Sequence, residues 1–156
     1  MSKASIEQTL EGFREAVKHA EVAAPAVSSW SVGEHIHHCC LSMIGVSKSL
    51  RKSTPPAPRA KPTIPRAAVF YFGFIPRGRA QSPSFVVPNP SLPHPELLAM
   101  LDQSAELLAM AGGLDRETWF THPFLGAMDR DQALKFVLVH NRHHLKIVAD
   151  ILKQRR

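Results

Sequence analysis

The sequence is short of cysteine and of long apolar runs, and its middle third lacks acidic residues. Its 156 residues include two cysteines, Cys39 and Cys40, whose adjacency excludes a disulfide framework. The longest apolar run, at 67–75, has about half the length that a helix needs to cross a bilayer. The polar N-terminal segment does not resemble a signal peptide. These absences favour a protein of the reducing cytoplasm with no membrane partner.

No aspartate or glutamate occurs between residues 35 and 95, whereas eight basic residues do. These are Lys48, Arg51, Lys52, Arg59, Lys61, Arg66, Arg77 and Arg79. A basic segment can attract phosphates, although such segments are more often solvated surface. The aromatic residues of this segment, at 70–74, lie in an apolar run that suits packing better than base stacking. The sequence therefore favours the interpretation that residues 48–79 form a solvated surface. Binding of nucleic acid through this segment is the less favoured alternative.

Apolar residues recur with a period near 3.6 in four long segments, which is typical of amphipathic helices. We expect these helices over residues 5–22, 32–52, 95–111 and 130–154. Ser31 is followed three positions later by Glu34, which is the spacing of a capping box at a helix start. Asp129 and Gln132 have the same spacing before the last helix.

A long crossover should join the second and third of these helices, because 11 of the 13 prolines fall between residues 55 and 95. Within it, an apolar segment at 66–75 predicts one short helix packed on the body. No internal repeat and no convincing strand alternation is present. We therefore predict an all-α protein with a single domain over residues 1–156, built as an up-down four-helix bundle. Its apolar residues exceed what one small bundle easily buries, so we also expect a homodimer.

Histidine is concentrated in two places, "HIHHCC" at 35–40 and "HNRHH" at 140–144. His140 and His144 are four residues apart on an otherwise apolar stripe, so both rings should point into the helical core. A metal ion would satisfy these buried rings, since nitrogens at this spacing can converge on one ion. A lone buried histidine is usually just hydrogen-bonded, but a pair plus a second cluster favours a metal site. His143 lies about 100° further round the helix and is a candidate to contact and orient a ligand.

A third ligand should come from another helix, because two histidines rarely make a stable site. The first cluster offers five candidates by residue type, namely His35, His37, His38, Cys39 and Cys40. Periodicity alone does not choose among them. A helix stripe that contains His38 and Gly45 is plausible, with Gly45 allowing a close approach between helices. The adjacent cysteines diverge on a helix and are expected to be small core residues.

The order of these motifs resembles the DinB-like superfamily, proteins named for DNA-damage induction. "WSVGEHIHH" at 30–38 is similar to the family's "W-S-x-x-E…H" pattern at the start of the second helix. "HNRHH" at 140–144 contains the family's "H-x-x-x-H" of the last helix. The "HP-x-x-G" loop at 122–126 resembles a branch known only as a domain of unknown function. The resemblance covers about residues 28–152, and the crossover at 54–92 departs from the core family.

The resemblance implies that His38, His140 and His144 are metal ligands and that Trp30 is a packing residue. It places neither His35 nor His37 at a ligand position. Three neutral imidazoles leave an open coordination position on zinc or nickel, as catalytic sites do. An ion held in this way can lower the pKa of a water or thiol.

The superfamily includes metal-dependent thiol S-transferases that use low-molecular-weight thiols, and related isomerases and hydrolases. The resemblance therefore implies a metal-dependent enzyme that acts on a small electrophilic substrate, by thiol transfer or by hydrolysis. No motif places a catalytic residue. Glu34 is the nearest carboxylate to His38 on the same helix face, although its capping role explains it better. The alternative is a non-catalytic stress-response or binding protein whose metal is structural.

Overall fold

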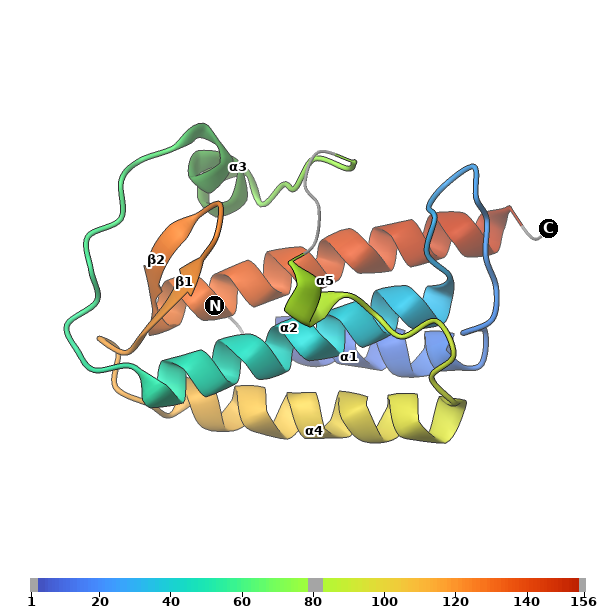
Figure 1. Ribbon diagram of the computed structural model, residues 1–156, viewed down its shortest axis with the longest axis horizontal. Helices are drawn as coiled ribbons and strands as arrows, with labels where there is room; N and C mark the ends of the chain where they lie inside the picture. The colour runs from blue at the N-terminus through green and yellow to red at the C-terminus, as the bar shows by residue number, and fades with distance from the viewer. Residues whose placement is uncertain (1–2, 79–82, 155–156) are drawn as a thin grey trace.

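Four long helices make up most of the protein. The computed structural model describes residues 3–78 and 83–154, so Arg79 of the basic segment lies outside the described residues. The long helices are α1 (Lys3–Val17), α2 (Val32–Lys52), α4 (His94–Gly112) and α5 (Arg130–Lys153). They lie side by side (Figure 1), and one hydrophobic cluster takes buried side chains from all four. The mostly helical architecture is confirmed, while the up-down order of the helices stays a prediction.

The helices that carry the two histidine clusters begin at the predicted capping residues. Ser31 Oγ accepts the backbone N–H of Glu34 at 3.2 Å, and Glu34 Oε2 accepts the backbone N–H of Ser31 at 2.8 Å. At the start of α5, Asp129 Oδ1 accepts the backbone N–H of Gln132 at 2.8 Å. Each bond satisfies a donor that the first helical turn leaves free. The caps therefore fix where the two histidine-bearing helices begin.

The first helix, α1, ends at Val17 and not at the expected residue 22. The turn that follows it lies against the start of α2. The backbone N–H groups of Val32 and Gly33 donate to the carbonyls of Val22 and Ala20, at 2.9 and 2.8 Å. A Cβ atom on Gly33 would lie 2.9 Å from the Cβ of Ala20. This is the close approach that requires glycine. The expected close approach at Gly45 is wrong, since a Cβ there would meet no atom within 4 Å.

The two glycines predict opposite effects on stability. Replacing Gly33 by alanine should lower the free energy of unfolding by about 1–3 kcal/mol, because the added methyl overpacks against Ala20. Replacing Gly45 by alanine should raise it by about 0.5–1 kcal/mol, since glycine inside a helix is destabilising relative to alanine. Urea unfolding of the two variants tests this pair. Equal losses in both would show that Gly33 has no special packing role.

A β-hairpin between α4 and α5 was not predicted from the sequence. Strands β1 (Trp119–His122) and β2 (Gly126–Asp129) pair antiparallel, with His122 opposite Gly126. Gly126 has a φ of 72°, which glycine adopts without strain. The strands are only four residues each and show no clean alternation of burial, so they left little signal in the sequence. The protein is therefore mostly helical, which is consistent with the predicted all-α class, and carries one small two-stranded sheet in the described part of the chain.

The expected short helix is present in the crossover, but it is more exposed than predicted. α3 (Ile64–Phe72) ends at Gly73, whose φ of 60° terminates the helix before Pro76. Val69 is the buried side chain of this helix. The exposed apolar side chains in and just after α3 are Ile64, Tyr71, Phe72 and Phe74. The expectation that this segment packs on the body holds for Val69, Phe70 and Ile75. It is wrong for Tyr71, Phe72 and Phe74, which are exposed.

This exposed apolar group leads to a testable statement about assembly. We predict that the chain forms a homodimer in which α3 is covered, because large exposed apolar patches mark contact surfaces. Light scattering at micromolar protein should give twice the chain mass of 17.3 kDa. Replacing Tyr71 and Phe72 together by serine should shift the mass toward that of one chain. A wild-type mass equal to one chain would contradict the prediction.

Two arginines of the basic segment hold the chain together. Arg66 Nη1 donates to two backbone carbonyls of the hairpin region at 2.8 and 2.9 Å, and its Nη2 donates to Gln132 Oε1 at 2.7 Å. Arg77 Nη2 lies 2.9 Å from Asp150 Oδ2. These contacts attach the crossover to α5, and they give two of the basic residues of the crossover a structural role.

None of the helices in the described part of the chain is long and apolar enough to cross a membrane.

Candidate metal centre

His38 on α2 meets His140 and His144 on α5, two helices that lie side by side in Figure 1. Each of these three residues, which we call the histidine triad, offers one ring nitrogen, and the three nitrogens lie within 4.8 Å of one another. Nε2 of His38 is 3.1 Å from Nε2 of His140. Two nitrogens bound to one ion at about 2.0–2.1 Å would be separated by about 3.0–3.4 Å. The triad therefore forms a group that could hold a metal ion.

Burial keeps the triad in the form that a metal needs. His38 and His144 are buried, whereas His140 is half-buried. Burial lowers the pKa of His38 below 6.5, and burial together with neighbouring histidines holds the pKa values of His140 and His144 well below it. All three rings are therefore neutral at pH 7 and have a free lone pair.

The crossover orients the ring of His38. A short 3₁₀ helix, η1 (Ser84–Val86), places the carbonyl of Val86 2.7 Å from Nδ1 of His38. A carbonyl oxygen only accepts, so Nδ1 of the neutral ring must donate its proton to this bond. The lone pair of His38 is then on Nε2, the nitrogen that faces His140. No sequence motif indicates this contact, because its acceptor is a backbone atom.

His35 contacts the triad directly, although the family resemblance placed it at no ligand position. Its Nδ1 is 2.9 Å from Nδ1 of His144, and its Nε2 is 2.9 Å from Oγ of Ser28. The side chain is 2% exposed, and burial lowers its pKa to about 4. The signal that could have found it is spacing. His35 precedes His38 by three residues, so the two rings share one face of α2.

The other candidates of the first cluster do not belong to the group that could hold a metal. Nδ1 of His37 accepts the backbone N–H of Asn89 at 2.9 Å. Cys39 and Cys40 are free and lie in the hydrophobic cluster, and burial raises the pKa of Cys40 to about 12. A thiol that resists ionisation is a poor metal ligand. The carboxylate of Glu34 is engaged in the cap of α2.

Aromatic rings surround the triad. The ring centroid of Trp30 lies 5.3 Å from that of His35, 5.0 Å from that of His38 and 6.4 Å from that of His144. Phe136 packs against His140, with 5.5 Å between centroids. Trp30, which was predicted to be a packing residue, thus packs against the rings of three histidines.

His143 and a further histidine lie near this group. The ring of His143 meets that of His144 edge-on, with 5.1 Å between centroids. Its role in orienting a ligand stays a prediction. His122 of β1 packs its ring against Phe136 at 4.9 Å, and its Nδ1 accepts backbone N–H groups of the following turn. Burial lowers the pKa of His122 to about 4.

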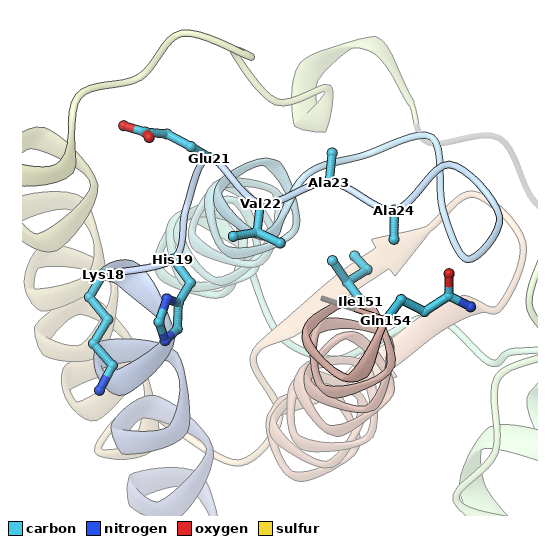
Figure 2. A pocket seen from close by; sticks show the side chains of 8 residues that line it. All are labelled: Lys18, His19, Glu21, Val22, Ala23, Ala24, Ile151 and Gln154. Carbon is cyan, nitrogen blue, oxygen red and sulfur yellow. The ribbon is translucent and has the colours of Figure 1, made fainter. Parts of the chain in front are cut away.

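Two cavities of the structure lie apart from the triad residues. One, of about 590 Å³, is lined by the turn that follows α1 and by the C-terminal end of α5. Figure 2 shows that its charged side chains, Lys18 and Glu21, point away from each other. A second, of about 660 Å³, lies between the start of α2 and residues 89–95. Binding sites need polar groups that converge, so the triad is the stronger candidate.

Comparison with known proteins agrees with the geometry. A sequence model of the DinB superfamily matches residues 4–148, which include all three triad histidines. No curated protein and no solved structure gave a significant match. Because the matched region covers nearly the whole chain, the family is established by sequence as well as suggested by the site. The chain belongs to the DinB superfamily.

Proposed function

We propose that the histidine triad binds one divalent metal ion, zinc or nickel, and leaves a coordination position open. The observation that carries the proposal is the approach of three neutral ring nitrogens to within 4.8 Å of one another. Structural zinc sites are usually closed by four protein ligands, whereas catalytic sites use three and keep one position free. Among the described residues, the group that could hold a metal ion has three members.

We further propose that the protein is a metal-dependent enzyme that acts on a small electrophilic substrate, with a low-molecular-weight thiol or water as nucleophile. A bound ion would lower the pKa of that thiol or water at the open position. The chain's own residues would orient the ligands and exclude water. The Val86 carbonyl fixes the ring of His38, while Trp30 and Phe136 cover the imidazoles. The free, buried Cys39 and Cys40 fit a reducing cytoplasm, where we place the protein.

Turnover by the metal-loaded protein tests this function. Zinc- and nickel-loaded samples should be incubated with a small thiol and an activated aryl halide, and separately with an activated ester. We expect one probe to be consumed at a rate proportional to the metal content. This turnover should be lost after chelation of the metal and in a His38→Ala variant. Stoichiometric metal uptake without turnover of either probe would favour the alternative, a binding protein whose metal is structural.

A further inference from the structure

His144 can serve as a ligand through Nε2 only if its ring proton lies on Nδ1. That Nδ1 atom is 2.9 Å from Nδ1 of His35, so one ring must donate and the other accept. If His35 donated, the proton of neutral His144 would sit on Nε2 and block the metal position. Which nitrogen of the neutral His35 ring carries the proton therefore decides whether Nε2 of His144 offers a lone pair to an ion.

The other end of His35 is also engaged. Its Nε2 lies 2.9 Å from Oγ of Ser28, and the same oxygen accepts the backbone N–H of Trp30 at 3.1 Å. Ser28 is itself held by its backbone N–H, which donates to the carbonyl of Ala24 at 3.0 Å. The hydroxyl oxygen can accept a hydrogen bond from Nε2–H of His35, and Nδ1 of His35 is then the unprotonated acceptor nitrogen. His35 is 2% exposed, so its ring nitrogens depend on these two protein partners.

We propose that Ser28 and His35 form a hydrogen-bond relay that holds the proton of His144 on Nδ1 and its lone pair on Nε2. Nδ1–H of His144 donates to Nδ1 of His35, and Nε2–H of His35 donates to Oγ of Ser28. The functional role of this relay rests on the proposed metal site, because the relay prepares one of its ligands. His35 acts here as a positioning residue that touches a ligand and not the ion. His38 is held in the same tautomer by a different group, the carbonyl of Val86.

The position of the ring protons tests the relay without any metal. Long-range ¹H–¹⁵N spectra of the metal-free protein report which nitrogen of each histidine carries the proton. We expect His144 to be protonated on Nδ1 and His35 on Nε2. The opposite pattern would overturn the relay, whether or not the protein binds metal. Failure of the proposed function would appear separately, as absence of zinc uptake by a protein that shows the expected tautomers.

Metal affinity gives a second, independent readout. His35→Leu removes the acceptor, and zinc affinity measured by competition with a chelator should fall about 10–100-fold. His35→Asn places a carbonyl oxygen near the position of Nδ1 and should recover most of this loss. His37→Leu is the matched control, because His37 is also buried and hydrogen-bonded but bonds to the backbone of Asn89 and not to the triad.

Two outcomes would overturn the positioning role. One is an equal loss of zinc affinity in His35→Leu and His37→Leu. The other is a complete loss in His35→Leu that His35→Asn does not recover, since this would identify His35 as a ligand. Circular dichroism checks that each variant folds. If His35→Leu does not fold, Ser28→Ala replaces it, and in that variant His144 should show a mixture of the two tautomers.

Discussion

Zinc occupancy should fall to near zero when His144 is replaced by alanine, and equally when His38 or His140 is replaced. The three ring nitrogens that lie within 4.8 Å of one another would then be reduced to two, an incomplete coordination sphere. Loss of a residue that only orients a ligand costs about 10–100-fold in affinity, and loss of a ligand should exceed that range. The effect should be similar for all three variants, because each supplies one nitrogen.

Elemental analysis after dialysis against zinc at concentrations well above the wild-type Kd measures this occupancy. Under these conditions, alanine variants of His35, His37 and His143 should retain most of the metal. Circular dichroism should show that all six variants keep their helical content. Stoichiometric metal in His140→Ala and His144→Ala, combined with its loss in His35→Ala or His37→Ala, would mean that the triad has been assigned wrongly.

Acidification from pH 7.5 to 5.5 should destabilise the metal-free protein by several kcal/mol. In the folded protein, burial lowers the pKa values of His35 and His122 to about 4. In the unfolded chain these imidazoles titrate near 6.5. The contribution of these buried neutral rings to the free energy of unfolding is therefore fully present well above pH 6.5. It falls below that pH, because the unfolded state then binds protons that the folded state does not.

The magnitude follows from the size of these shifts. Each such histidine lowers the free energy of unfolding by about 1.4 kcal/mol at pH 5.5, so His35 and His122 together account for about 3 kcal/mol. His140 and His144, whose pKa values burial also holds well below 6.5, add to the loss. A typical domain has only about 5–15 kcal/mol of stability, so the acid effect is a large fraction of it.

Urea unfolding of metal-stripped protein at the two pH values measures this effect. His122→Gln should reduce the difference between them by about 1.4 kcal/mol, because it removes one of the contributing groups. Bound zinc should be released over the same range, since protons compete with metal for imidazole nitrogens. A free energy of unfolding that is constant from pH 7.5 to 5.5 would contradict the burial of these rings.

Features that depend on local spacing could be predicted from the sequence. α2 runs from Val32 to Lys52, as predicted, because the Ser31–Glu34 capping box fixes its start. The pairing of His140 with His144 followed from their four-residue separation on one apolar stripe. The choice of His38 as the third member came from the family resemblance, since periodicity left five candidates in the first cluster.

Features that depend on tertiary contacts could not be predicted in this way. The contact between His35 and His144 requires the rotation of α2 relative to α5, which no local pattern specifies. The bond from His38 to the Val86 carbonyl joins residues 48 positions apart and uses a backbone acceptor. The exposure of Tyr71 and Phe72 depends on how α3 is placed on the other helices, whereas the apolar run itself suggested burial.

Anomalous diffraction from crystals of the zinc- or nickel-loaded protein, recorded at the absorption edge of the metal, is the most direct test of the proposed centre. We expect one strong peak between α2 and α5, about 2.0–2.1 Å from one nitrogen each of His38, His140 and His144. Nδ1 of His144 should remain hydrogen-bonded to His35, and one coordination position should be filled by a non-protein ligand. A peak bound by the sulfur of Cys39 or Cys40, or one placed away from these three histidines, would contradict the assignment.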